Sequence, residues 1–238
     1  MKGFRREYVG KLELTFIADI HSNLEALEVV LEKVKGGPIY CLGDLVGYGA
    51  NPNEVIDIVR SKGIKCILGN HDYAVCTGDT SYFNPRAVNA ILWTRRVVTK
   101  ENSEFLLSLP RILRLKKENR KILLAHATPE NPIFGDYIHP ETDPFKFLSY
   151  ATEYEEDIMG LGHLHVPYAY HKLDKVIFNP GSVGQPRDGN PLARYCTINL
   201  ESLKVKFFEL DYDRELSARK IVQAGLPTIF ATRLFKGI

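Results

Sequence analysis

The chain has 238 residues, 45% of them hydrophobic, and its 31 basic and 29 acidic side chains give a formal net charge of +2. Its apolar runs are short and broken by charges, which excludes a transmembrane helix and a membrane partner, and its bulk charge gives no strong nucleic-acid signal. Residues 1–14 lack the apolar segment of a secretory signal, so we expect a cytoplasmic protein.

The first part of the chain alternates short apolar runs with segments of helical periodicity. Strands are expected at residues 12–18, 38–42 and 64–68, and helices at residues 24–34 and 53–60. This β-α-β-α-β order predicts a parallel sheet with helices packed on it.

The remaining chain is richer in short strands. Residues 85–109 look mainly helical, with Pro85 at the first helical position. Further strands are expected at residues 112–115, 121–125, 158–159, 166–171, 175–179, 193–200 and 205–210. A core of two sheets with helices outside would bury both parts of the chain.

No Pro/Gly/Ser-rich linker divides the sequence, so we expect one domain over residues 1–238. Residues 128–156 are rich in proline and predict loops plus one helix near residues 144–151, in a segment that could cap a cleft. Residues 212–238 predict a helical tail that packs either on the domain or in a dimer.

Seven Asp, Asn and His side chains each follow a predicted strand. They are Asp19, His21, Asp44, Asn70, His126, His163 and His165. Because ligands bind at the carboxyl ends of strands in α/β sheets, we expect five strands to deliver these side chains to one sheet edge. Glycines precede three of these residues, at Gly43, Gly69 and Gly162, where a tight turn out of a strand needs a permissive backbone.

The spacing within two pairs is i, i+2. In an extended chain, Asp19 and His21 would point the same way about 6.6 Å apart, and so would His163 and His165. That separation suits one ion, or two ions about 3.5–4 Å apart.

The donor set consists of oxygen and nitrogen atoms without thiolate, since no cysteines form a CxxC pair. Such donors suit two divalent transition-metal ions, with Mn²⁺ as the first choice and Ni²⁺, Fe²⁺, Co²⁺ or Zn²⁺ as alternatives. Each residue alone has a structural explanation: Asp19 as a charge at a helix start, Asp44 and Asn70 as turn residues, His126 as a core histidine. The joint pattern favours a metal site.

Five ordered motifs resemble those of the calcineurin-like metallophosphoesterases. They are DIH (19–21), GDLVGYG (43–49), GNHD (69–72), the histidine at 126 and GHLH (162–165). The segment NPGSVGQPRDG (179–189) resembles a loop of the bacterial and archaeal phosphodiesterase branch. The resemblance implies a four-layer α/β/β/α sandwich of two mixed sheets flanked by helices.

The resemblance also implies a role for each residue. One metal would be held by Asp19, His21 and His165, the second by Asn70, His126 and His163, and Asp44 would bridge the two. His71 would not be a ligand but would contact the substrate and its leaving group, which makes His71 and Asp44 the expected catalytic residues. Asp72 could orient His71, or serve as the acid at a helix start.

Substrate contacts are expected from Asn70, His71 and Arg187. Arg187 is the one cation that we nominate for positioning the phosphate, since a guanidinium grips two oxygens. A structural turn over residues 186–189 is the alternative interpretation.

The flanking residues narrow the activity. LVGYG follows Asp44 in place of the VDRG of protein Ser/Thr phosphatases, and the chain after His126 lacks an HGG or HARG continuation, so protein phosphatase activity is not expected. We therefore predict a phosphodiesterase that hydrolyses small phosphate diesters or nucleotides by in-line attack of a metal-bridging hydroxide. A dinucleoside-polyphosphate hydrolase or phosphomonoesterase is the alternative, followed by a non-catalytic scaffold of the same fold.

Overall fold

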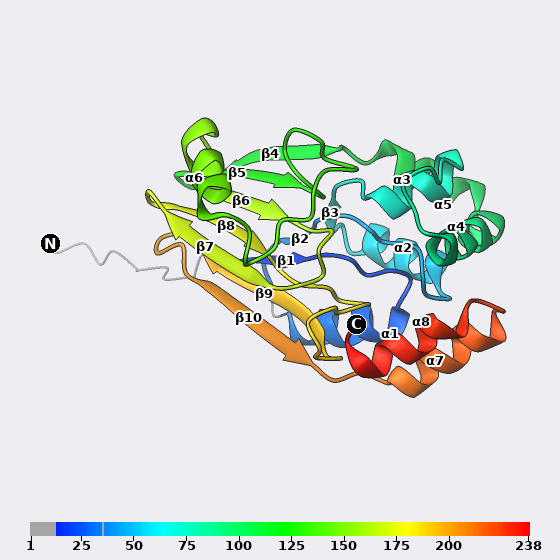
Figure 1. Cartoon of the computed structure of the whole chain (residues 1–238). Coiled ribbons are helices and arrows are strands. Elements are labelled where there is room, and N and C mark those ends of the chain that lie inside the picture. Colours follow the sequence, from blue (N-terminus) through cyan, green and yellow to red (C-terminus); the bar gives the residue numbers. More distant parts are fainter. Residues whose placement is uncertain (1–12, 35) are drawn as a thin grey trace, which may run out of the picture.

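The computed structural model describes residues 13–34 and 36–238. Two five-stranded mixed sheets lie face to face with helices on their outer sides, which confirms the predicted α/β/β/α sandwich (Figure 1). Residue 12, where the first strand was expected to begin, lies outside the described residues. So does most of the segment 1–14, which was expected not to be a secretory signal. Among the helices of the described ranges, none has the length and apolar character needed to span a membrane.

The first sheet has the order β10-β9-β1-β2-β3. Its strands are β1 (Glu13–Ile17), β2 (Ile39–Cys41), β3 (Lys65–Cys66), β9 (Ala193–Asn199) and β10 (Val205–Leu210). As predicted, β1, β2 and β3 are parallel, whereas β9 pairs antiparallel with both β1 and β10. The β-α-β-α-β segment thus forms three of the five strands of a mixed sheet.

The second sheet has the order β4-β5-β6-β8-β7. Its strands are β4 (Ile112–Lys117), β5 (Arg120–Ala125), β6 (Ile158–Leu161), β7 (Tyr168–Lys172) and β8 (Lys175–Asn179). Strands β5, β6 and β8 are parallel, while β4 and β7 pair antiparallel with their neighbours.

Side-chain alternation explains why these strands read as continuous apolar runs. Phe16 of β1 points between the sheets, where its ring lies 4.8 Å from that of Phe178, and the next residue, Ile17, packs with the helices on the other face. Because both faces of the inner strands are covered, successive residues of β1, β6 and β8 are buried, whereas the edge strands β4, β7 and β10 keep exposed side chains. Each such side chain stabilises the fold by about 1.5–3 kcal/mol.

Helices close the sandwich on both sides. The outer face of the first sheet packs against α1 (Leu24–Lys33) and α2 (Pro52–Ser61), and that of the second against α6 (Pro144–Glu153). Beyond the strand ends lie α3 (Asn70–Thr77), α4 (Pro85–Val97) and α5 (Lys100–Ser108) (Figure 1). The expected helical region at 85–109 is thus two helices, because Thr99 caps α5 by accepting a hydrogen bond from the Asn102 amide.

The chain ends in the helix pair α7 (Arg214–Gln223) and α8 (Thr228–Lys236). Phe230 and Leu234 are buried in one cluster with Ile221 of α7 and Tyr48. The predicted helical tail therefore packs on the domain, next to the loop that follows β2.

Candidate metal centre

The seven predicted ligands converge, but from two sheets. Asp19, His21, Asp44 and Asn70 follow β1, β2 and β3 of the first sheet. His126, His163 and His165 follow β5 and β6 of the second. The expectation of one shared sheet edge is therefore wrong. The parallel strands of the two stacked sheets end on the same side of the sandwich, so two edges face one site (Figure 1).

The backbone at these positions is left-handed rather than extended, which corrects the expected geometry of the i, i+2 pairs. The φ angles are 54° at Asp19, 50° at His21, 54° at Asp44, 67° at His163 and 66° at His165. This conformation costs an L-residue about 1–2 kcal/mol and is concentrated at functional sites. It turns the chain sharply at the strand ends and directs the side chains inward.

Three of the side chains form a first group. Asp19, His21 and His165 each offer one donor atom, and these atoms lie within 4.8 Å of one another. The Nδ1 atoms of His21 and His165 pair with the carbonyl oxygens of Val46 (3.0 Å) and Gln185 (2.5 Å). Since a carbonyl only accepts, both protons sit on Nδ1 and both Nε2 atoms present lone pairs.

Those two Nε2 atoms lie 3.1 Å apart. Beside them, the carboxylate of Asp19 is buried, and among the described residues neither of its oxygens has a hydrogen-bond partner, although Oδ1 lies 3.4 Å from His165 Nε2. Burial raises the pKa of Asp19 to about 8, because an unpaired carboxylate is unfavourable away from water. Facing lone pairs and a buried unpaired carboxylate fit a divalent cation between them.

A second group surrounds Asp44. Its Oδ2 atom lies 3.6 Å from His21 Nε2 and 3.4 Å from His126 Nε2, and its Oδ1 accepts a hydrogen bond from the His71 amide. His126 Nδ1 pairs with the Leu42 carbonyl at 2.7 Å, and His126 Nε2 lies 3.0 Å from Asn70 Oδ1. Asp44 thus stands between the two groups, where a bridging carboxylate would be needed.

The pKa of His126 also reflects its closeness to Asp44. Burial lowers the pKa of His126, but the adjacent Asp44 carboxylate outweighs it and raises the pKa to about 9. His126 Nε2 thus faces the oxygens of both Asp44 and Asn70. The donor set of oxygens and imidazoles suits a borderline transition metal.

His163 and His71 complete the surroundings. The His163 ring lies 5.1 Å from that of His126, and burial lowers its pKa to about 3, which leaves the neutral form that binds metals. His71 also offers a nitrogen within 4.8 Å of donor atoms of His21 and Asp44. Its position is thus compatible with ligation as well as with the substrate contact expected from the sequence.

The Asp72 carboxylate pairs with backbone amides rather than with the His71 ring. Its carboxylate accepts hydrogen bonds from the amides of Val46 and Gly69, both at 3.1 Å. It therefore ties the loop after β2 to the start of α3, which is the helix-start interpretation of this residue.

The glycines before the ligands act for different reasons. Gly43 has a φ of +90°, as expected for a turn that needs a permissive backbone. Gly69 has an ordinary φ of −92°, but a Cβ there would lie 2.1 Å from Asp44 Oδ1 and 2.3 Å from the Asp44 amide nitrogen. At Gly69, close approach of two backbones is the requirement.

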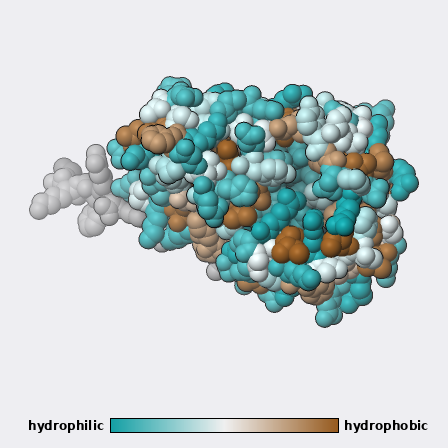
Figure 2. Space-filling model, in the orientation of Figure 1, coloured by the Kyte–Doolittle hydropathy of each residue, from teal (hydrophilic) through white to brown (hydrophobic). Residues whose placement is uncertain are grey.

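A cavity of about 350 Å³ opens over this cluster. Its lining includes Asp44, Asn70, His71, His163 and His165. One wall is aromatic and includes Phe134 and Tyr137 from the 128–156 segment, and Tyr137 stacks on His163 with ring centres 4.1 Å apart. Figure 2 shows that the exposed face here is largely hydrophilic, with apolar groups in separate spots.

Two arginines also line the cavity, Arg187 and Arg233. Arg187 donates to Gln185 Oε1 at 3.0 Å, and its guanidinium carbon lies 5.8 Å from the Tyr48 ring centre. Of these two, only Arg187 was expected from the sequence to contact the substrate. Arg233 lies on α8, far from every motif, and only folding brings it to the site.

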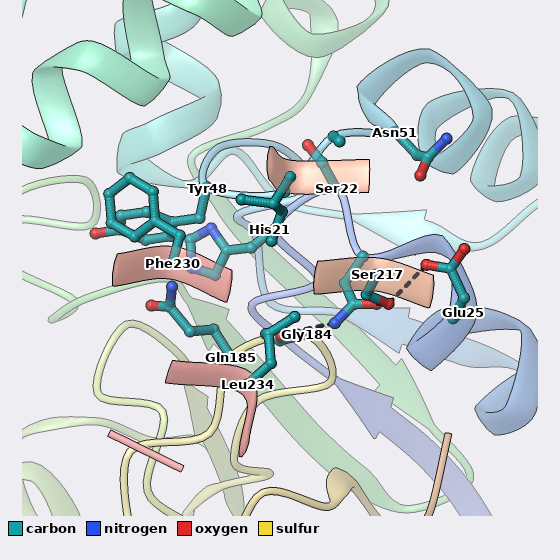
Figure 3. Close-up of a pocket in the computed structure, with 14 residues that line it drawn as sticks. His21, Ser22, Glu25, Tyr48, Asn51, Gly184, Gln185, Ser217, Phe230 and Leu234 are labelled. Atoms are coloured by element: carbon teal, nitrogen blue, oxygen red, sulfur yellow. Dashed lines mark hydrogen bonds between the residues drawn. The ribbon is translucent and has the colours of Figure 1, made fainter. Parts of the chain in front are cut away.

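Behind His21, residues of α7 and α8 close a small pocket of about 10 Å³, room for about one water molecule. Figure 3 shows His21 beside Tyr48 and Phe230, with Gln185 and Leu234 on the side of the C-terminal helices. Ser217 of α7 donates to Glu25 at 2.7 Å, which fastens this helix to α1. The C-terminal helices thus support the His21 side of the cluster.

Comparison with known proteins bears on this site. The model of the calcineurin-like phosphoesterase superfamily domain matches residues 12–203. An uncharacterized protein of Methanocaldococcus jannaschii is 38% identical, with 95% of this chain and 99% of that protein covered. A crystal structure of a metallophosphoesterase from Sphaerobacter thermophilus aligns with a TM-score of 0.78 at 30% identity, covering 95% of this chain and 99% of that one. Phosphodiesterase YfcE of Escherichia coli is 26% identical over 82% of this chain and 91% of its own.

Proposed function

The chain belongs to the calcineurin-like phosphoesterase superfamily, and we propose that it is a dinuclear-metal phosphodiesterase acting on small phosphate diesters, nucleotides included. The observation that carries the proposal is the pair of facing Nε2 atoms of His21 and His165, 3.1 Å apart, beside the unpaired carboxylate of Asp19. Mn²⁺ is the proposed metal and the cytoplasm the proposed location.

The proposed ligand assignment follows the two groups of donors. Asp19, His21 and His165 hold one ion, Asn70, His126 and His163 hold the other, and Asp44 bridges them. The position of Asp44 Oδ2, within 3.6 Å of an Nε2 atom from each group, supports the bridging role.

Two divalent ions in such a site stabilise charge on the phosphoryl group and make water a nucleophile near neutral pH. The chain itself supplies position and hydrogen bonds. Burial lowers the pKa of His71 to about 4, so its ring is neutral at pH 7 and acts by donating an N–H to the leaving oxygen. Its Nδ1 is buried and has no hydrogen-bond partner in the described part of the chain, and its ring is held between those of Tyr48 (4.4 Å) and Phe83 (4.9 Å).

Arg187 is proposed to grip a non-bridging oxygen of the phosphate. A guanidinium presents parallel N–H groups that match two oxygens, and the contacts with Gln185 and Tyr48 fix its direction.

Hydrolysis of bis(p-nitrophenyl) phosphate tests the proposal. Protein stripped with a chelator should be inactive, and added Mn²⁺ should restore turnover. Full activity in the stripped protein would contradict it. A panel of diesters, monoesters and diadenosine tetraphosphate then separates the proposed activity from the polyphosphate-hydrolase and monoesterase alternatives, and metal content separates it from a non-catalytic scaffold.

A further inference from the structure

The cavity over the metal cluster continues into a second hollow. Arg233 and Asn84 line both spaces, and the second, of about 330 Å³, is also lined by Arg86. Arg187 lines only the first and Arg86 only the second. The three arginines therefore line two adjoining spaces: Arg187 lines the cavity over the metal cluster, Arg86 lines the second hollow, and Arg233 lines both.

Aromatic contacts hold the inner two arginines in place. The Arg187 guanidinium carbon lies 5.8 Å from the Tyr48 ring centre, and that of Arg233 lies 6.0 Å from the Phe230 ring centre. The Tyr48 and Phe230 rings pack together at 4.9 Å, side by side in Figure 3. Two cations from segments far apart in sequence thus flank one aromatic pair.

None of these three arginines has a carboxylate of the described residues within 4.0 Å, and the same holds for Arg95, Arg96 and Arg111. The other described arginines form ion pairs: Arg60, Arg114, Arg120, Arg194, Arg214 and Arg219. The Nε atom of Arg233 is buried and has no hydrogen-bond partner among the described residues. Burial lowers the pKa of Arg233, and the nearby charges of Arg187 and Arg86 lower it further. Such a row of unpaired cations is stabilised by an anion.

We propose that Arg233 and Arg86 form a second anion subsite, which holds a phosphate group of the substrate next to the one that reacts. The substrate class is then a small phosphate diester that carries a further phosphate group, as some nucleotides do. The orientation of this substrate, with its reacting phosphate at the metal cluster and Arg187, rests on the proposed function. Arg233 is a specificity-determining residue supplied by α8, beyond the 12–203 span that the family model matches.

Calorimetric binding of inorganic tripolyphosphate and orthophosphate to the Mn²⁺-loaded protein, in excess Mn²⁺, tests the subsite directly. Wild-type protein should bind tripolyphosphate at least about tenfold more tightly than orthophosphate. The reason is that the longer anion can make additional charge-assisted hydrogen bonds with Arg233 and Arg86. Arg233→Gln and Arg86→Gln should each reduce this preference several-fold. Because Arg86 is exposed, Arg86→Gln should fold normally, and it therefore tests the subsite even if Arg233→Gln misfolds.

Arg96→Gln is the matched control, since it removes the same charge from an exposed arginine near the other end of α4. Arg96→Gln should keep the wild-type preference for tripolyphosphate over orthophosphate. Tripolyphosphate also chelates Mn²⁺, but it does so equally with every variant, so the comparison between variants is unaffected. The subsite is overturned if wild type shows no preference, or if Arg96→Gln loses as much as Arg233→Gln and Arg86→Gln. Failure to hydrolyse diesters would contradict the proposed function while leaving this binding contrast as a separate result.

Discussion

His21 and His165, which are 144 residues apart in the chain, direct their Nε2 atoms at each other across 3.1 Å while both Nδ1 atoms pair with backbone carbonyls. Two lone pairs at this distance repel unless a cation or proton lies between them. We therefore expect His165→Ala to lower bound Mn²⁺ from two equivalents towards one, measured by elemental analysis after gel filtration. His171→Ala, at an exposed histidine of β7, should keep both ions. Full occupancy in His165→Ala would remove His165 from the proposed ligands.

His71→Ala should separate turnover from metal binding. We expect both ions to remain bound and kcat to fall about 10²–10⁴-fold, the range typical of losing a positioned proton donor. His139→Ala, at an exposed histidine, is the control and should behave as wild type. If His71→Ala instead loses an ion, the closeness of His71 to His21 and Asp44 reflects ligation, and our assignment is wrong.

Metal affinity should rise with pH. In the metal-free chain the pKa of Asp19 is raised to about 8, mainly by burial, and that of His126 to about 9, where the Asp44 carboxylate outweighs burial. Both groups are therefore protonated at pH 7, and an ion must displace their protons. Each proton released strengthens binding about tenfold per pH unit below these pKa values. Titrations with Mn²⁺ from pH 6 to pH 8 measure this slope, and an affinity that stays constant over this range would contradict it.

Gly69→Ala should destabilise the fold, because the added Cβ would meet Asp44 at 2.1–2.3 Å. Overpacking of this kind costs about 1–3 kcal/mol, and each kcal/mol lowers Tm by about 2–4 °C in a chain of this size. Gly225→Ala is the control, since that site has a φ of +71° but open space around it. Equal losses of Tm in the two variants would show that contact with Asp44 is not what requires glycine at residue 69.

Much of the fold was predictable because its strands obey simple rules. Phe16 and Ile17 are both apolar because one faces the second sheet and the other faces the helices, so β1 stands out in the sequence. The apolar residues of α3 form no helical stripe, so the only sign of this helix in the sequence was the interpretation of Asp72 as the acid at a helix start.

The structure brings the predicted site residues together, but their backbone geometry could not be predicted from the sequence. Asp19, His21 and Asp44 were identified by their positions after strands, yet their left-handed backbone depends on hydrogen bonds between loops, such as His21 N to Asp44 O. Arg233 gave no signal, because nothing in the sequence of α8 indicates that Phe230 packs on Tyr48 and carries the arginine to the cavity.

Two divalent ions, held by the seven proposed ligands, are proposed to be required for phosphodiester hydrolysis. The most direct test is the rate of bis(p-nitrophenyl) phosphate hydrolysis as Mn²⁺ is titrated into chelator-stripped protein, followed together with bound metal. We expect no turnover without metal and a rise to full activity as occupancy reaches two ions per chain. Turnover that is independent of metal, or that is complete at one ion per chain, would contradict it.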